Sequence, residues 1–304
     1  MPYDLKNPLV IGISSRALFD LEAENRIFET QGLKAYEEYQ VLHEKDILPK
    51  GPAFPLVRAF LELNKLQPER LVEVIVMSRN SPNTSLRIFN SIEHYGLDIT
   101  RAALSGGGAI APYLHAFQTD LFLSAHQPDV QQAINSGIAA GTILTGTVPE
   151  LASRGQIRIA FDGDAVLFSP ASERIYQHKG LDAFTSYERR KADIPMEEGP
   201  FAKFLQTIAH IQSKFSDQNA SPIRTALVTS RSAPAHERAI KTLRQWGVRV
   251  DEAFFLGGVS KQEVLSAFGA HIFFDDQAVH AEPASQFVPS AVVPYAEGQN
   301  PMRK

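Results

Sequence analysis

The segment "RIYQHKGLDAFTSY" (174–187) repeats an earlier segment of the same chain, "RIFETQGLKAYEEY" (26–39), at an offset of 148 residues. Six of the fourteen positions are identical, whereas average residue usage gives about one identity by chance. Three further pairs of segments match in the same order at offsets of 151 to 152 residues: "VIVMSRNSP" (74–82) with "ALVTSRSAP" (226–234), "LSGGGAI" (104–110) with "FLGGVSK" (255–261), and "DLFLSAHQ" (120–127) with "HIFFDDQ" (271–277). The sequence therefore predicts a duplication, with a first repeat over 1–150 and a second over 151–304.

Each repeat has the same order of apolar patterns. A short apolar strand comes first, and a connection of about 35 residues leads to an amphipathic helix, a β-branched strand and a second helix (86–95; 235–246). A Gly-rich turn, a short helix and a final strand follow. The amphipathic helices are marked by Phe54, Val57 and Leu61, and by Phe201, Phe204, Leu205 and Ile208. Strands that alternate with helices predict an α/β fold of two Rossmann-type units, with parallel strands and helices on both faces.

Composition narrows the class of protein. The 304 residues carry a net charge of −4 with a pI near 6.2, which disfavours a nucleic-acid polymer or an anionic membrane as partner. The absence of cysteine excludes disulfides, thiolate catalysis and cysteine-based metal sites. The sequence has no apolar run as long as a membrane span, and its first residues lack a signal-peptide pattern. We expect a soluble cytoplasmic protein; a homo-oligomer stays open.

Polar side chains follow the expected strands of the second repeat: Asp162, Asp164, Thr229, Asp275 and Asp276. An aspartate after a strand is more often a turn former or a helix cap than a catalytic group. Ligands of parallel sheets, however, bind beyond the carboxyl ends of the strands, where all five of these residues are expected. The coincidence favours a functional site.

Four carboxylates in one crevice require a cation, and a set of oxygen ligands without nitrogen or sulfur favours Mg²⁺. One carboxylate, such as that of Asp162, could then attack phosphorus, and Asp164 could act as general acid and base. The hydroxyl of Thr229 and the ammonium of Lys261 would stabilise phosphoryl oxygens. The chain contains no G-x-x-x-x-G-K-[ST] phosphate loop and no H-E-x-x-H zinc motif, and "SGGGA" does not continue as G-x-G-x-x-G.

The order "DGDAV", "LVTS", "GGVSK", "FFDD" resembles the four motifs of the haloacid dehalogenase superfamily of phosphatases. The run "GISSRALFD…GLKAYEEYQ…GPAFPLVRAF", the segment "NSIEHYGLDITRAALSGG" and "AFDGDAVLFS" are similar to the cytosolic 5′-nucleotidase type I family. This resemblance covers roughly residues 8 to 290, which includes the first repeat.

The resemblance implies a role for each matching position. Asp162 would be the nucleophile that becomes an aspartyl-phosphate, and Asp164 the general acid/base. Thr229, Ser230, Arg231 and Lys261 would bind the phosphate or substrate. The implied metal set is Asp162, Asp164 through its backbone carbonyl, Asp275 and Asp276, with the direct ligand among the last two left open. The implied reaction is Mg²⁺-dependent hydrolysis of a nucleoside 5′-monophosphate, with AMP as leading candidate. A phosphatase for another small phosphate ester and a nucleotide-binding regulator without turnover are the alternatives.

The first repeat lacks these groups. Its aligned positions are Ser14, Arg16, Met77, Ile110 and Ser124–Ala125, so we expect it to be catalytically silent. It would then act as a packing partner, or it would contribute to a substrate or effector site. The second hypothesis rests on Arg16, Arg79 and the Gly106–Gly108 turn, where an anion could bind.

Three further features stay open. The dipeptide Ser-Arg occurs in both repeats, at Ser78–Arg79 and Ser230–Arg231, and would cap a helix, pair with a structural acid or contact a nucleotide. Segment 169–199 lies where the superfamily places its cap, and its rings Tyr176, Phe184 and Tyr187 would stack on a base or pack internally. The end of the chain, from residue 288 on, reads as a short strand and a polar tail without assigned function.

Overall fold

A computed structural model describes residues 5, 7–144, 156–215 and 221–301. The first repeat contains, in chain order, β1 (Leu9–Ile13), α1 (Ser15–Leu18), α2 (Glu22–Leu42), α3 (Phe54–Glu62), η1 (Leu63–Lys65), β2 (Val72–Ser78), η2 (Pro82–Thr84), α4 (Leu86–His94), β3 (Arg101–Leu104), α5 (Ala111–Ala116), β4 (Leu121–Ser124), α6 (Gln127–Asn135) and β5 (Ala139–Ile143). The second repeat contains β6 (Ile157–Phe161), α7 (Ala171–Arg190), α8 (Ala202–Ser213), β7 (Ile223–Thr229), α9 (His236–Gln245), β8 (Glu252–Phe255), α10 (Gln262–Phe268), β9 (Ile272–Asp275), α11 (Ala278–Ala284) and β10 (Ser290–Val292).

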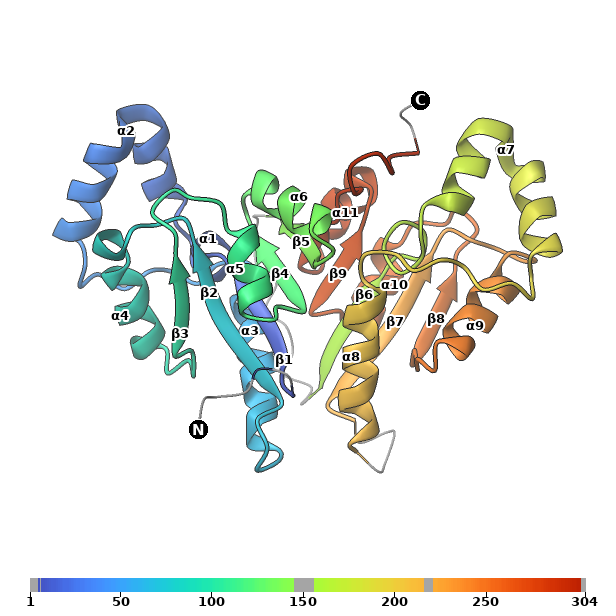
Figure 1. The fold of residues 1–304 in the computed structure, drawn as a ribbon, viewed down its shortest axis with the longest axis horizontal. Helices are drawn as coiled ribbons and strands as arrows, with labels where there is room; N and C mark the ends of the chain where they lie inside the picture. The colour runs from blue at the N-terminus through green and yellow to red at the C-terminus, as the bar shows by residue number, and fades with distance from the viewer. Residues whose placement is uncertain (1–4, 6, 145–155, 216–220, 302–304) are drawn as a thin grey trace.

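The described strands form one ten-stranded sheet in the order β3-β2-β1-β4-β5-β10-β9-β6-β7-β8. Neighbouring strands run parallel except at the centre, where β10 pairs with β5 in the antiparallel direction. The order on one side of this junction mirrors the order on the other, as Figure 1 shows. The α/β fold class with a mostly parallel sheet is thus confirmed, and the two repeats join through their last strands.

Strands β1 and β2 are buried along their whole length because helices cover both faces of the sheet. Every residue of β1 and β2 is buried, which is typical of parallel strands with two covered faces. Phe161 of β6 stacks on Phe274 of β9, and Phe201 lies 4.6 Å from Phe274 between ring centres. One buried apolar cluster contains residues of both repeats. The predicted division at 150/151 lies outside the described residues and stays a prediction.

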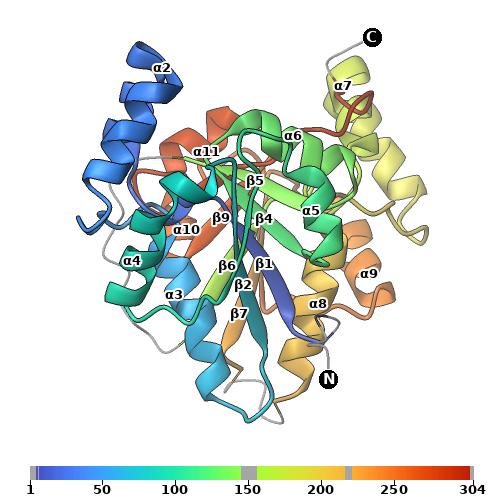
Figure 2. The same cartoon turned by 60° about the vertical axis from the view of Figure 1, so that its left-hand side comes forward.

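The two long helices α2 and α7 stand at opposite sides of the molecule (Figures 1 and 2). Both bend at a glycine, Gly32 with φ 86° and Gly180 with φ 77°, where other residues are strained. These glycines hold equivalent positions in the repeated segments that open the sequence analysis. The expected cap, 169–199, contains α7, and the first repeat has the same kinked helix, so this feature is not confined to the second repeat.

The pairing register corrects one sequence alignment. Ile13 pairs with Val76 and Phe161 pairs with Leu227, so β2 and β7 are related by an offset of 151 residues rather than 152. The residue equivalent to Thr229 is therefore Ser78, not Met77. The backbone agrees, since Asn80 N–H donates to Ser78 Oγ as Arg231 N–H donates to Thr229 Oγ1. The shared Ser-Arg dipeptides are not equivalent in the structure: Arg231 corresponds to Asn80.

No helix in the described ranges has both the length and the apolar character needed to cross a membrane.

Candidate active site

The polar residues predicted at the strand ends gather at the carboxyl edge of the second half of the sheet. Strand β6 lies between β7 and β9, so Asp162, directly after β6, has Thr229 at the end of β7 on one side. Asp275, at the end of β9, lies on its other side. The connection after Asp162 is tight: a Cβ on Gly163 would lie 3.2 Å from Thr229 Oγ1. Sheet order alone brings these three residues together.

Lys261 links two of the carboxylates. It stands at the N-terminal end of α10, and its Nζ lies 2.6 Å from Asp162 Oδ1 and 2.6 Å from Asp275 Oδ2. All three side chains are buried. Burial alone would lower the pKa of Lys261, but the carboxylates of Asp162 and Asp275 outweigh burial and raise it. The lysine is therefore held as a cation between the two acids.

The three buried acids differ in their protonation. Burial, partly offset by Lys261, raises the pKa of Asp162 to about 7. Burial and the charges of Asp162 and Asp275 raise the pKa of Asp276 to about 8. Burial would also raise the pKa of Asp275, but the neighbouring His280, whose Nδ1 lies 3.6 Å from Asp275 Oδ2, and the hydrogen bond from Lys261 lower it. Three carboxyl groups thus lie near a single lysine, and two of them hold their protons more strongly than a free aspartate does.

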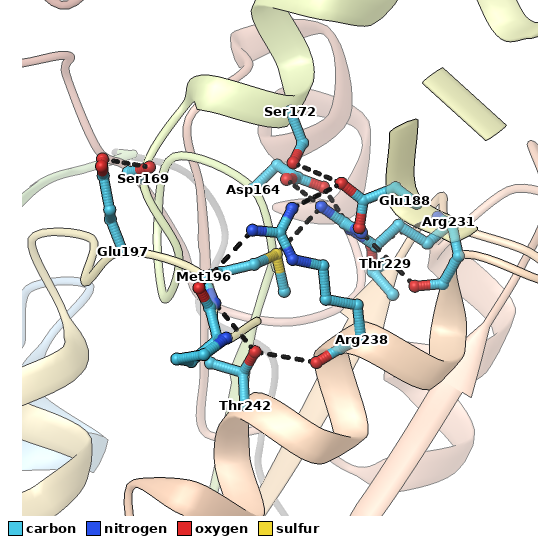
Figure 3. Close-up of polar contacts among 12 residues, drawn as sticks. Asp164, Ser169, Ser172, Glu188, Met196, Glu197, Thr229, Arg231, Arg238 and Thr242 are labelled. Carbon is cyan, nitrogen blue, oxygen red and sulfur yellow. Dashed lines mark hydrogen bonds and ion pairs between the residues drawn. The ribbon is translucent and has the colours of Figure 1, made fainter. Parts of the chain in front are cut away.

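Asp164 has a different partner. Arg231 donates from Nε to Asp164 Oδ2 and from Nη2 to Asp164 Oδ1, both at 2.7 Å, in a two-point ion pair. The Nη1 group of Arg231 lies 2.5 Å from Glu188 Oε2, and Arg238 Nη1 lies 3.0 Å from Glu188 Oε1. Ser172 also donates to Glu188. Figure 3 shows this chain of contacts, which connects the kinked helix α7 to Asp164.

Three residues of this site were missed by the sequence reasoning. Glu188 and Arg238 hold Arg231 and α7 in place, and they belong to no motif. Tyr295, in the tail after β10, donates from its hydroxyl to Asp276 Oδ2. The backbone oxygen of Tyr295 accepts a hydrogen bond from Gln131 of α6, so the tail also contacts the first repeat. No local pattern could indicate these contacts, because each joins residues that are far apart in sequence.

The remaining predicted residues are placed as follows. Thr229 is buried, and its hydroxyl oxygen accepts from the Arg231 N–H at 3.2 Å. Ser230 is exposed and lines a cavity of about 250 Å³ together with Lys261 and His280. Arg231 is almost completely buried in its ion pairs; a direct contact with a nucleotide stays a prediction, and the pairs favour a positioning role. Phe184 and Tyr176 pack against each other, with ring centres 6.2 Å apart.

The donor set can be tested for a divalent cation. Asp162 and Asp275 share one buried ammonium, and Asp276 beside them accepts from the Tyr295 hydroxyl. A bound cation would stabilise the ionised forms of these three carboxyl groups. The residues therefore fit a hard cation that prefers oxygen ligands. Within the described residues, however, no three acidic or histidine side chains are already gathered at metal-holding distances.

Comparison with known proteins gives the family of this chain. The sequence model of the family described as 5′-nucleotidase matches residues 1–300. Human cytosolic 5′-nucleotidase 1B is 41% identical over 291 residues, which is 92% of this chain and 48% of that protein. The chain thus spans about half the length of this curated relative. The fold is α/β with a mostly parallel sheet, and the chain belongs to the 5′-nucleotidase family.

Proposed function

We propose that this chain hydrolyses nucleoside 5′-monophosphates to a nucleoside and inorganic phosphate, with AMP as the leading substrate. The observation that carries the proposal is the buried contact of Lys261 with Asp162 and Asp275, beside Asp164 and Thr229. A nucleophilic carboxylate needs a fixed cation beside it that also attracts the transferred phosphoryl group. Membership of the 5′-nucleotidase family and the name of the human relative support the substrate class.

In the first step, a carboxylate oxygen of Asp162 attacks phosphorus and the bond from phosphorus to the 5′ oxygen breaks. Asp164 gives its proton to that oxygen, so the nucleoside leaves as a neutral alcohol. Lys261 and the Thr229 hydroxyl stabilise the phosphoryl oxygens. Because both oxygens of Asp164 accept from Arg231, Asp164 has to turn from Arg231 and take up a proton from solvent before it acts as the acid.

In the second step, water attacks the phosphorus of the aspartyl-phosphate on Asp162. Asp164 takes a proton from that water, and the bond between phosphorus and the Asp162 oxygen breaks. This releases phosphate and restores both carboxyl groups to their starting forms. A small cavity reaches Lys261, the neighbour of Asp162, together with Ser230 and His280.

Mg²⁺ would be held by Asp162, Asp276 and the backbone carbonyl of Asp164. Asp276 is the better candidate for direct contact, because Asp275 is engaged at Oδ2 by Lys261 and at Oδ1 by the Gln277 N–H. The cation would offset the charge of the acids and of the incoming phosphate. Tyr295 would orient the Asp276 carboxylate through its hydroxyl.

The test is phosphate release from AMP by the purified chain, with Mg²⁺ and with EDTA, and with Asp162→Asn as control. We expect metal-dependent release that the substitution abolishes. A panel of nucleoside monophosphates and sugar phosphates separates a nucleotidase from a phosphatase for another small ester. A folded protein that binds nucleotides and releases no phosphate from any of them would instead be a regulator without turnover.

A further inference from the structure

The first repeat keeps a cavity at the place where the second repeat has its catalytic groups. It has a volume of about 440 Å³, within the range of small-molecule sites. It lies beyond the carboxyl ends of β1, β2 and β4, where Ser14, Ser78 and Ser124 contribute to its wall. By the pairing register, these serines correspond to Asp162, Thr229 and Asp275. The duplication has therefore preserved the cavity while its chemistry changed.

The central ion pair of the second repeat has no counterpart here. Asp164 is replaced by Arg16, and Arg231 is replaced by Asn80. An arginine and an asparagine amide group both donate, so they cannot reproduce the pair. Among the described residues, the buried Nε of Arg16 and the buried Nδ2 of Asn80 have no hydrogen-bond partner, and both residues line the cavity. Buried donors are nearly always satisfied, so a ligand that offers acceptor oxygens suits this cavity.

Three acids line the cavity, Glu24, Glu37 and Asp129, and two of them have partners within the protein. Glu24 pairs with Arg87 at 2.6 Å, and Asp129 contacts His126 at 3.1 Å and Arg79 at 3.8 Å. The cavity also lacks the carboxylates of the second repeat, since Ser14 and Ser124 replace two of them. A ligand here needs no metal ion, and Ile110 in place of Lys261 leaves no catalytic lysine. An anionic group would meet serine hydroxyls and the Nε of Arg16, whose Nη1 and Nη2 already donate to Asn25 and Glu22.

Part of the wall is apolar and aromatic. Leu21, Phe28, Leu33 and Tyr36 line the cavity, with Phe28 and Leu33 about half exposed. The rings of Phe28 and Tyr36 meet edge to face at 6.0 Å. Such a wall accepts a flat ring system by stacking and burial. The Gly106–Gly108 turn, by contrast, does not offer its N–H groups to an anion, because they donate to backbone oxygens of Asn80, Arg79 and Ser105.

We propose that the cavity of the first repeat binds a nucleoside monophosphate without a metal ion and without hydrolysing it. The phosphate would accept from Arg16 and Asn80, and the base would lie against Phe28 and Leu33. The choice of nucleoside monophosphate rests on the proposed function, because the two cavities descend from one duplicated site. The unpartnered donors and the aromatic wall are independent of that function.

The experiment measures AMP binding in EDTA by equilibrium dialysis, which removes the metal-dependent reaction. We expect one AMP per chain for the wild type and for Lys261→Met, which disables the second repeat. Binding should weaken at least tenfold in Arg16→Met and in Leu33→Trp, which fills the cavity from an exposed position and removes no buried donor. Adenosine and inorganic phosphate should each bind more weakly than AMP. Thermal unfolding verifies that each variant is folded.

Two results would overturn the inference: no AMP bound in EDTA, or binding that Lys261→Met abolishes while Arg16→Met and Leu33→Trp leave it intact. Adenosine bound as tightly as AMP would overturn the role of the anion. Phosphate release with Mg²⁺, measured on the same wild-type sample, keeps the two proposals apart. If the protein releases phosphate with Mg²⁺ but binds no AMP in EDTA, this inference alone is contradicted. If it binds AMP in EDTA but releases no phosphate with Mg²⁺, the proposed function alone is contradicted.

Discussion

The ammonium of Lys261 lies 2.6 Å from a carboxylate oxygen of Asp162 and equally close to one of Asp275. Lys261 stands at the N-terminal end of α10, and the two aspartates lie at the ends of the neighbouring strands β6 and β9. All three side chains are buried. Lys261 therefore stabilises two buried acids, and under the proposed function it would also stabilise the transferred phosphoryl group.

Lys261→Met should destabilise the protein and abolish phosphate release. The methionine fills similar space, but Asp162 and Asp275 are left buried without their cation, which costs about 3–5 kcal/mol in unfolding free energy. Urea unfolding in EDTA measures the loss. The matched control is Lys241→Met, whose ion pairs are exposed, and it should change stability by less than about 0.5 kcal/mol. Equal effects of the two substitutions would contradict the role of Lys261.

Thr229→Val should lower kcat by about 100-fold, the usual loss when one donor to a reacting oxygen is removed. Valine has the same shape but no hydroxyl, and it also leaves the Arg231 N–H without its acceptor. Thr229→Ser keeps the hydroxyl found at the equivalent Ser78 and should retain most of the activity. Steady-state phosphate release compares the two variants, and a serine variant as inactive as the valine variant would exclude the hydroxyl as the important group.

Glu188→Gln should destabilise the protein by about 3 kcal/mol, because Arg231 and Arg238 lose a shared buried charge. The first repeat shows an alternative arrangement. There the residue equivalent to Glu188 is Gln40, and Arg87, equivalent to Arg238, pairs with Glu24, at the position of Ser172. The double variant Ser172→Glu/Glu188→Gln reproduces that arrangement.

We expect the double variant to recover part of the lost stability, as Arg238 regains a partner, while its kcat stays low because Arg231 does not. Ser172→Glu alone places a second acid beside Glu188 and should destabilise. Urea unfolding of the three variants gives the comparison. A double variant no more stable than Glu188→Gln would show that the two repeats do not use interchangeable ion pairs.

Asp120→Asn should stabilise the protein at neutral pH. Burial raises the pKa of Asp120, outweighing the hydrogen bond from the Val10 N–H and the charge of Lys203. A carboxyl whose pKa is higher in the folded than in the unfolded protein favours folding most below its ordinary pKa of about 4. That contribution is lost as the pH rises through the folded value. Asparagine can still accept from Val10 but carries no charge.

The gain from Asp120→Asn should therefore be larger at pH 7.5 than near pH 4. Urea midpoints at the two pH values measure it. Asp193→Asn, at an exposed position, serves as control and should show little pH-dependent difference from the wild type. A gain that is independent of pH would contradict the burial of a charged Asp120.

Much of this fold could be predicted from the duplicated sequence, because apolar periodicity and strand-helix alternation are local signals. The helices expected at 86–95 and 235–246 are α4 and α9 within two residues. The antiparallel pairing of β5 with β10 could not be predicted, because the two strands are short and far apart in sequence. Neither contains a local pattern that identifies its partner strand. It is this pairing that joins the repeats into one sheet.

The site shows the same division. The carboxylates and Lys261 follow recognisable strands or turns, so their meeting at one edge could be predicted from parallel topology. Glu188 and Tyr295 reach the site from a helix and a tail without any motif. The equivalence of Ser78 with Thr229 was missed because the identical Ser-Arg letters favoured an alignment shifted by one residue. The correct alignment follows from the hydrogen-bond register between neighbouring strands, which sequence identity does not reveal.

The central claim is that Asp162 of the second repeat is the nucleophile, and the most direct test is to trap its phosphoryl group. The protein is mixed with AMP labelled in the phosphate, quenched in acid within one turnover, digested and analysed by mass spectrometry. We predict a phosphoryl group on Asp162, no label in Asp162→Asn, and no phosphoryl group on any residue of the first repeat. Phosphate release at the wild-type rate by Asp162→Asn, or label on a different residue, would contradict the account.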